Sequence, residues 1–258
     1  MTEIGLNLYS LRNCIATEED FLSTAIRLRE MGYTFLQYSG AAFDPDRIAR
    51  VSKESGMPVI LTHVPADRII NETDQLMEEH AKFGCKNIGL GALGMKIIGD
   101  KDLCFSKLES LERAAEKMEK NGFSFFYHNH HHEFYQHDGQ TVFDYMIENT
   151  PHINFTLDTY WAQFGGVSVA DYVKRLKGRI GCVHLKDYRI AAKADEDILE
   201  VLPQFAPVGD GTIDFKQLVP LMREAGTSYF IVEQDNAALA PDPFVPVERS
   251  VKYIKKEL

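Results

Sequence analysis

The stretch FFYHNHHHEFYQHDG, residues 125–139, contains five of the nine histidines of the chain, together with Asn129, Glu133 and Asp138. Imidazoles and carboxylates bind divalent metals, and histidine also transfers protons near neutral pH because its unperturbed pKa lies in that range. Three interpretations therefore compete: a metal-binding tract, a catalytic strand end, or a polar loop that happens to be rich in histidine.

Three further polar residues each end an apolar run: Asp158 in FTLDTYW, His184 in CVHLKD and Glu233 in FIVEQD. Taken singly, each has an ordinary structural explanation, such as a helix cap for the Asp. Three such ends in succession favour a shared site. With a fourth donor from the histidine-rich stretch, the set suits Mn²⁺, Mg²⁺, Co²⁺, Fe²⁺ or Zn²⁺, and its lack of thiolates argues against a purely structural site.

Alternating apolar and amphipathic segments must position these residues. The apolar run IGLNLYS is followed by the helical pattern ATEEDFLSTAIRLREMG, and the same order recurs down to PFVPVERSVKYIKKEL, which gives eight strands and eight helices. Most strand runs are continuously apolar, as parallel strands are when both faces are covered. The sequence therefore predicts an α/β fold, a single (β/α)8 TIM barrel over residues 1–258.

This architecture also predicts where the site lies, because active sites of such barrels form at the C-terminal ends of the strands. The polar residues at the predicted strand ends are Asn7, Tyr9, Gln37, Tyr38, His63, His128, His130, Asp158, His184, Lys186, Glu233 and Asp235. We expect them to converge on one mouth of the barrel.

The composition limits the classes of partner. A formal net charge of −10 argues against nucleic-acid binding, which needs Lys and Arg to neutralise phosphates. No apolar run approaches the roughly 20 residues needed to span a bilayer, and MTEIGLNLYS lacks secretory features. The four cysteines form no C-x-x-C pair and are expected to be reduced and mostly buried. We expect a cytoplasmic protein without nucleic-acid or membrane partners, and a possible homo-oligomer.

Over essentially its whole length, the sequence resembles the xylose isomerase-like superfamily of sugar isomerases, epimerases and related enzymes. The matching segments are IGLNLYSLR, LTHVP, YHNHHHEF, LDTYWAQFGG, HLKD, VGDGTIDF and IVEQD. The resemblance implies a divalent metal held by residues of strands five to eight, commonly Glu, Asp, His and Glu. Asp158, His184 and Glu233 match the last three. The first ligand is either His128, at the strand-five position, or Glu133 in the HNH-x-x-EF pattern, and we favour Glu133.

The resemblance also implies proton abstraction next to a carbonyl of a sugar, keto-sugar or polyol, which requires a stabilised enediolate, an acid and a base. The candidate catalytic residues are Glu233, His130, His128 and Lys186. The candidate substrate-binding residues are His63, Trp161, Tyr38, Gln37 and Asn7. VGDGTIDF has neither a P-loop Lys nor a G-x-G-x-x-G spacing, so we expect a turn before a helix cap at Asp214 and an unphosphorylated substrate.

The expected function is therefore a divalent-metal-dependent sugar isomerase or epimerase of carbohydrate metabolism, with manganese among the candidate metals. The main alternative is a lyase of the same superfamily that acts by β-elimination on an inosose or a 3-keto-glycoside, because one branch shares the HNH-x-x-EF pattern. A phosphodiesterase similar to AP endonucleases would need a basic DNA-facing surface, against which the charge of −10 argues. A non-catalytic sugar-binding subunit is the fourth alternative.

Overall fold

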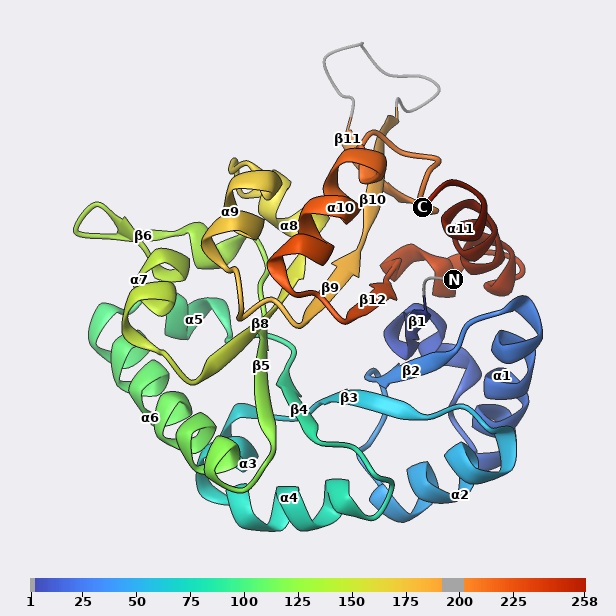
Figure 1. Cartoon of the computed structure of the whole chain (residues 1–258), viewed down its shortest axis with the longest axis horizontal. Helices are drawn as coiled ribbons and strands as arrows, with labels where there is room; N and C mark the ends of the chain where they lie inside the picture. The colour runs from blue at the N-terminus through green and yellow to red at the C-terminus, as the bar shows by residue number, and fades with distance from the viewer. Residues whose placement is uncertain (1–2, 192–201) are drawn as a thin grey trace.

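The computed structural model describes residues 3–191 and 202–258 and shows a closed barrel of parallel strands surrounded by helices (Figure 1). Around the barrel the strands follow the order β1-β12-β9-β8-β5-β4-β3-β2, so the first strand closes on the last. The barrel strands are β1 (Ile4–Asn7), β2 (Phe35–Tyr38), β3 (Val59–His63), β4 (Asn87–Leu90), β5 (Ser124–His128), β8 (Ile153–Asp158), β9 (Cys182–Leu185) and β12 (Tyr229–Val232). The prediction of a (β/α)8 barrel is confirmed.

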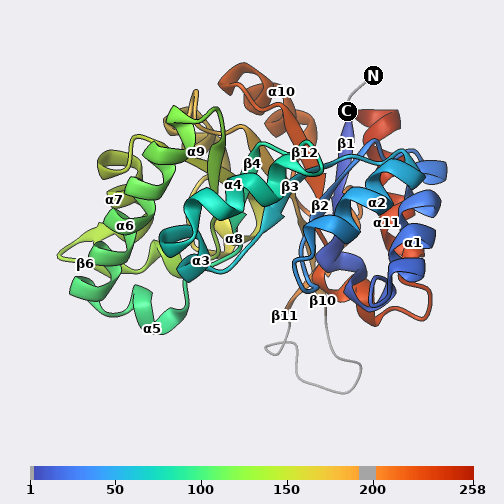
Figure 2. The same cartoon turned by 90° about the horizontal axis from the view of Figure 1, so that it is seen from below.

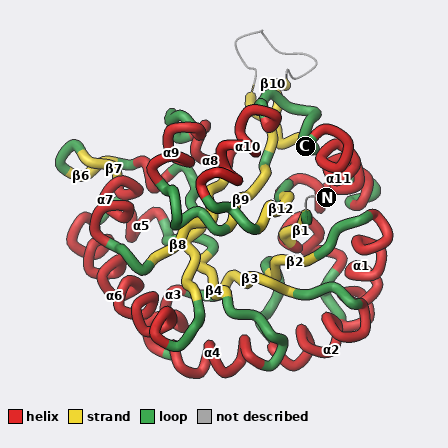
Figure 3. Tube along the Cα trace, in the orientation of Figure 1, coloured by secondary structure: helices red, strands yellow, loops and turns green. Residues whose placement is uncertain are grey.

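Helices form the outer layer (Figure 3). The α-helices are α1 (Glu18–Met31), α2 (Pro45–Ser55), α3 (Ala66–Asn71), α4 (Thr73–Ala81), α5 (Met95–Ile98), α6 (Lys101–Lys120), α7 (Val142–Asn149), α8 (Thr159–Phe164), α9 (Val169–Arg175), α10 (Phe215–Ala225) and α11 (Phe244–Glu257). Short 3-10 helices are η1 (Leu8–Cys14), η2 (His132–Phe134) and η4 (Asp235–Leu239). Their ends follow local sequence: Thr17 and Asp20 form a capping box at the start of α1, and Gly32 ends that helix with a φ of 100°.

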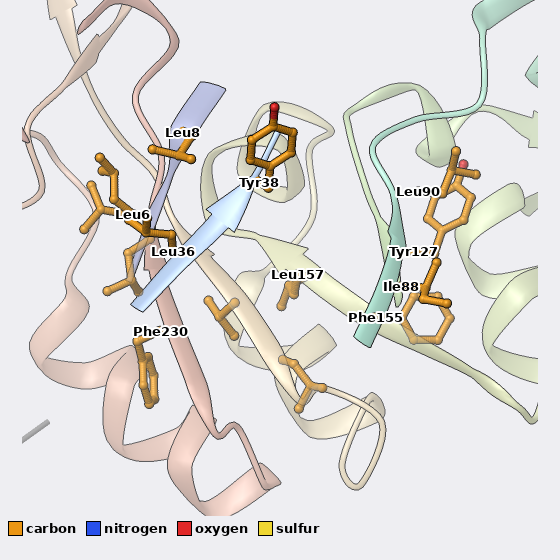
Figure 4. Close-up of a cluster of buried hydrophobic side chains, with 14 of the residues drawn as sticks. Leu6, Leu8, Leu36, Tyr38, Ile88, Leu90, Tyr127, Phe155, Leu157 and Phe230 are labelled. Atoms are coloured by element: carbon orange, nitrogen blue, oxygen red, sulfur yellow. The ribbon is translucent and has the colours of Figure 1, made fainter. Parts of the chain in front are cut away.

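The main hydrophobic core lies between the strands and the helices, and Figure 4 shows part of it, including Leu6, Leu36, Phe155 and Leu157. Successive strand residues point to opposite faces, so alternate residues face the inside of the barrel. A smaller buried cluster on that inner side consists of Phe35, Leu61, Phe126, Cys182 and Ile231. The residues two positions further along the chain from these five are polar, and they lie at or just after the strand ends: Gln37, His63, His128, His184 and Glu233. The strand period therefore places one polar layer at the C-terminal mouth, above an apolar floor.

Two short hairpins interrupt the alternation of strands and helices. After β9, the chain forms the antiparallel pair β10 (Asp187–Ala191) and β11 (Leu202–Ala206). A second pair, β6 (Gln136–His137) and β7 (Gln140–Thr141), precedes α7. In Figure 2, β1 begins near the top and the β10–β11 hairpin lies at the lower side, where the C-terminal strand ends open.

Two expectations from composition can be compared with the structure. All four cysteines are free; Cys85, Cys104 and Cys182 are buried and Cys14 is partly buried, as expected for reduced core thiols. Within residues 3–191 and 202–258, no helix has the length and apolar character needed to cross a membrane.

Candidate functional site

Four side chains converge at the C-terminal ends of β5, β8, β9 and β12. We call His128, Asp158, His184 and Glu233 the inner cluster; one donor atom from each lies within 4.8 Å of the others, and all four residues are buried. Nε2 of His128 lies 3.3 Å from Oδ2 of Asp158 and 3.1 Å from Nδ1 of His184. Nδ1 of His184 in turn lies 2.5 Å from Oε2 of Glu233. The structure thus brings three of the predicted ligands together with His128.

The outer nitrogens of both histidines are held by oxygen acceptors. Nδ1 of His128 lies 3.0 Å from the carbonyl oxygen of Gly91, and Nε2 of His184 lies 2.6 Å from Oε1 of Gln37. A carbonyl oxygen only accepts hydrogen bonds, so each of these ring nitrogens carries the hydrogen and donates it. The inward nitrogens, Nε2 of His128 and Nδ1 of His184, are therefore the ones that can bind a cation, which is how metal-ligating histidines are commonly held.

The inner cluster fits a divalent metal ion. It offers two imidazole nitrogens and two carboxylates, a donor set suited to Mn²⁺, Fe²⁺, Co²⁺ or Zn²⁺. Oε2 of Glu233 is buried and forms an ion pair with Nδ1 of His184 at 2.5 Å. A buried carboxylate oxygen of this kind is costly unless a cation compensates it.

The charges of the inner cluster are strongly coupled. Burial would raise the pKa of Asp158, but Lys186 and hydrogen bonds from His128 and His184 lower it to about 2. Glu233 behaves in the same way, with a pKa well below its ordinary value. Burial would lower the pKa of His184, but Glu233 and Asp158 raise it to about 9. Both carboxyls are therefore ionised at neutral pH.

Lys186 is a buried cation beside the inner cluster. Its Nζ donates to Oδ1 of Asp235 at 2.8 Å and lies 3.8 Å from Asp158 and 3.9 Å from Glu233. Burial would lower its pKa, but these three carboxylates together raise it, so the ammonium group stays charged. Nζ also lies 5.0 Å from the ring centre of Trp161 and 4.8 Å from that of Phe205. The ammonium group of Lys186 thus lies between carboxylates and aromatic rings.

Glu133 lies in a neighbouring group with His130 and His132, outside the inner cluster. Its carboxylate accepts hydrogen bonds from the hydroxyl of Tyr127 and the backbone N–H of His130, both at 2.7 Å. The structure therefore differs from the expectation that Glu133 joins the other three ligands. The reason is local: β5 ends with His128 on the inner face, whereas Glu133 follows a turn and bonds back to Tyr127, which faces the outer core.

A cavity of about 250 Å³ opens beside the inner cluster. It is lined by Tyr9, Ser39, His63, Gly91, Ala92, His128, His130, Glu233 and Asp235. His130 lies with its ring centre 4.7 Å from that of His128 and 5.2 Å from that of Trp161. Burial and His128 lower the pKa of His130 to about 3, and its buried Nδ1 has no hydrogen-bond partner among the described residues. We call this space the mouth cavity.

Of the five residues expected to bind substrate, His63 lines the mouth cavity, whereas Trp161, Tyr38, Asn7 and Gln37 do not. Tyr38 is buried in the core and donates its hydroxyl to the carbonyl oxygen of Ala42, and Asn7 is buried and accepts from the backbone N–H of Tyr9. Gln37 is buried between two histidines, since its Nε2 lies 2.7 Å from Nε2 of His63 while its Oε1 meets His184.

Sequence reasoning also missed three contributors to the mouth cavity, Ser39, Gly91 and Ala92. Gly91 acts through its backbone carbonyl, which leaves no side-chain signal. The segment NIGLGA indicates only a close backbone approach: a Cβ at Gly91 would stand 3.1 Å from Nδ1 of His63.

The VGDGTIDF segment binds a carboxylate of the chain itself. The backbone N–H groups of Gly209 and Gly211 donate to Oδ2 of Asp187 at 3.0 Å, and that of Ile213 donates to Oδ1 at 3.2 Å. A Cβ at Gly211 would lie 2.2 Å from the same carboxylate, which explains the glycine. Asp214 then caps α10, as predicted. The loop is therefore a structural turn.

Comparisons with known proteins agree with this architecture. The family model for the xylose isomerase-like TIM barrel matches residues 26–257. An inosose dehydratase from Lacticaseibacillus casei is 26% identical over 153 residues, which are 56% of this chain and 51% of that protein. The chain thus spans about half the length of the curated relatives it matches.

Solved structures share the fold. A sugar phosphate isomerase/epimerase from Parabacteroides distasonis superposes with a TM-score of 0.77 at 21% identity, covering 98% of this chain and 93% of that one. A 3-keto-D-glucoside 4-epimerase from E. coli superposes with a TM-score of 0.67 at 18% identity, covering 99% and 100%. Together with the family match, these similarities confirm the resemblance inferred from the sequence. The chain belongs to the xylose isomerase-like TIM-barrel family.

Proposed function

We propose that this protein is a divalent-metal-dependent sugar isomerase or epimerase. It removes a proton from the carbon next to a carbonyl of a sugar, keto-sugar or polyol. The observation that carries the proposal is the inner cluster: two carboxylates and two suitably oriented imidazoles, buried together beside a cavity. The fold relatives named as isomerase/epimerase and as 3-keto-D-glucoside 4-epimerase support the same class of reaction.

His128, Asp158, His184 and Glu233 would hold the metal ion. When bound, the ion supplies positive charge for the oxyanion that develops as the proton leaves. In this arrangement His128 takes the place that the sequence assigned to Glu133, while Glu133 orders the loop that carries His130.

Residues that line the mouth cavity are placed to remove the substrate proton. Asp235 lines the cavity, and burial together with Glu233 and Asp158 raises its pKa despite the hydrogen bond from Lys186. A raised pKa makes the Asp235 carboxylate a stronger base than an ordinary aspartate. His130 presents a neutral imidazole with an unpaired Nδ1 on the same cavity. We assign Asp235 as the base that removes the proton, Lys186 as the cation that stabilises negative charge, and His130 as a neutral group that lines the cavity beside them.

The lining favours an uncharged substrate. Among the described residues that line the mouth cavity, Glu233 and Asp235 carry negative charge and there is no Arg or Lys. A phosphate group would meet these carboxylates without a partner cation in the lining. The VGDGTIDF loop offers no alternative anion site, because Asp187 occupies its N–H groups. An unphosphorylated sugar, keto-sugar or polyol therefore fits best.

A second candidate is β-elimination, which begins with the same proton abstraction. The relative named inosose dehydratase favours it. In that reaction the electron pair left on the carbon expels a group from the next carbon, and the departing oxygen takes up a proton. The two reactions differ in the mass of the product, which equals that of the substrate in isomerisation or epimerisation and is lower after elimination.

The test is a metal-loaded assay in D₂O with ketoses, inososes and 3-keto-glycosides, followed by mass spectrometry. An isomerase or epimerase returns product of the same composition with solvent deuterium at the carbon next to the carbonyl, whereas a lyase releases water or an aglycone. Asp158→Ala should abolish turnover, while Glu109→Gln, at an exposed acid on α6, should not. Equal turnover by wild type and Asp158→Ala would refute the proposal.

A further inference from the structure

A second, larger cavity lies behind the wall of the mouth cavity. It has a volume of about 430 Å³ and lies between β11, η4 and the start of α11. The residues that follow β12 separate the two cavities: Glu233 and Asp235 line the mouth cavity, whereas Gln234 and Asn236 line the second one. The two cavities share no lining residue among those described.

The second cavity contains a buried polar atom that lacks a partner. Nδ2 of Asn236 donates to the carbonyl oxygen of Phe205 at 3.0 Å, which fixes the orientation of that amide. Oδ1 of Asn236 then accepts from Nε2 of Gln234 at 2.8 Å, which fixes the second amide in turn. Oε1 of Gln234 is left buried without a hydrogen-bond partner among the described residues. Gln234 lines the cavity and is only 5% exposed, and a small shift of its side chain would let a donor on an occupant pair with the unpaired oxygen.

The other lining groups restrict which class of molecule fits the second cavity. Arg189 contributes guanidinium donors, and among the described residues it contacts Gln204 at 3.4 Å, whereas Arg249 is paired with Asp210 at 2.6 Å. A hydroxyl group can both donate to Oε1 of Gln234 and accept from Arg189. An ionised carboxylate or a phosphate dianion only accepts, and would leave Oε1 of Gln234 facing another lone pair. The proline and valine side chains in the lining suit the C–H face of a ring.

We propose that the second cavity is a binding site for a neutral sugar or polyol, distinct from the catalytic site. Its volume falls in the range of small-molecule sites. An occupant would contact the outer side of residues 233–236, the segment whose inner side carries Glu233 and Asp235. The site therefore lies where a second sugar can influence the catalytic residues without competing for the mouth cavity.

The test is saturation-transfer NMR on the full chain in the presence of chelator, with methyl α-D-glucopyranoside and myo-inositol as probes. Val245→Trp places a bulky ring on the exposed edge of the cavity and should abolish transfer to the probe that binds. Arg189→Met should weaken binding about tenfold. Arg113→Met, at an exposed arginine on α6, is the matched control and should bind as wild type does.

A further variant shows in which of the two cavities the probe binds. Glu233→Gln alters the mouth cavity and should leave probe binding unchanged. Absence of transfer to either probe in the wild type, or transfer that survives both Val245→Trp and Arg189→Met, would overturn the proposal. Loss of binding in Glu233→Gln alone would place the probe in the mouth cavity and overturn it equally. Because neither metal nor turnover enters the measurement, failure of the proposed enzymatic function would leave this result intact.

Discussion

Oε1 of Gln37 accepts a hydrogen bond from Nε2 of His184 at 2.6 Å. The other end of the same amide meets His63, which in turn lies 3.3 Å from the hydroxyl of Ser39. This chain of contacts fixes the ring of His184 so that Nδ1 faces Asp158 and Glu233. Gln37, interpreted from the sequence as a substrate contact, is thus a positioning residue for the proposed metal site.

Replacing Gln37 should weaken metal binding without touching a ligand. Gln37→Leu removes the acceptor of the His184 N–H, and loss of such an outer contact commonly costs about 10- to 100-fold in metal affinity. Gln37→Glu keeps an acceptor and should retain more of the affinity. Titration of chelator-treated protein with Mn²⁺, followed by electron paramagnetic resonance, measures both variants. Affinity in Gln37→Leu equal to that of the wild type would show that the contact does not position the ligand.

Removing the buried charge of Lys186 should separate metal binding from turnover. Lys186→Met takes a cation away from Asp158, Glu233 and Asp235, so the metal should bind at least as tightly as in the wild type. Turnover should fall by about 10²- to 10⁴-fold, because the developing oxyanion loses a stabilising charge. Metal affinity and kcat measured on the same preparation test this. Unchanged kcat would exclude Lys186 from the chemistry.

The loop built around Asp187 should not tolerate a side chain at Gly211. Gly211→Ala would force a Cβ to 2.2 Å from Oδ1 of Asp187 and displace the carboxylate from its N–H donors. We expect a loss of about 2–4 kcal/mol in the free energy of unfolding. Gly94→Ala is the control, since a Cβ there has no atom within 4 Å and the φ of Gly94 is −67°. Urea unfolding that finds equal stability in both variants would contradict the role of Asp187.

His80 should make stability fall in mild acid. Nδ1 of this buried histidine lies 2.6 Å from the carbonyl oxygen of Leu76, and Nε2 lies 2.7 Å from the hydroxyl of Thr62. Burial lowers its pKa from 6.5 to about 4. Between these two pH values the unfolded chain binds a proton that the folded chain does not, so the free energy of unfolding decreases as the pH falls.

The expected size is about 1.4 kcal/mol per pH unit, or roughly 3 kcal/mol in total. His80→Gln keeps a donor and an acceptor but cannot titrate, so its stability should decrease less between pH 6.5 and 4. Denaturant unfolding of both proteins across this window gives the difference. Parallel pH profiles would show that His80 is not buried in its neutral form.

The sequence predicted the barrel and three members of the inner cluster because both rest on local patterns: apolar runs of strand length, each ending in Asp158, His184 or Glu233. It could not choose between His128 and Glu133. SFFYH is apolar on both faces, as a parallel strand covered on both sides must be, so no alternation reveals which residues face inward. The role of Gln37 was equally hidden, since its partners lie 26 and 147 residues away along the chain.

The central claim is that His128, and not Glu133, completes a metal site with Asp158, His184 and Glu233. Equilibrium titration of chelator-treated protein with Mn²⁺ should find about one ion per wild-type chain. His128→Ala should bind it at least about 100-fold more weakly, whereas Glu133→Gln should retain most of the affinity. Loss of the ion in Glu133→Gln with normal binding in His128→Ala, or no binding by the wild type, would contradict the account.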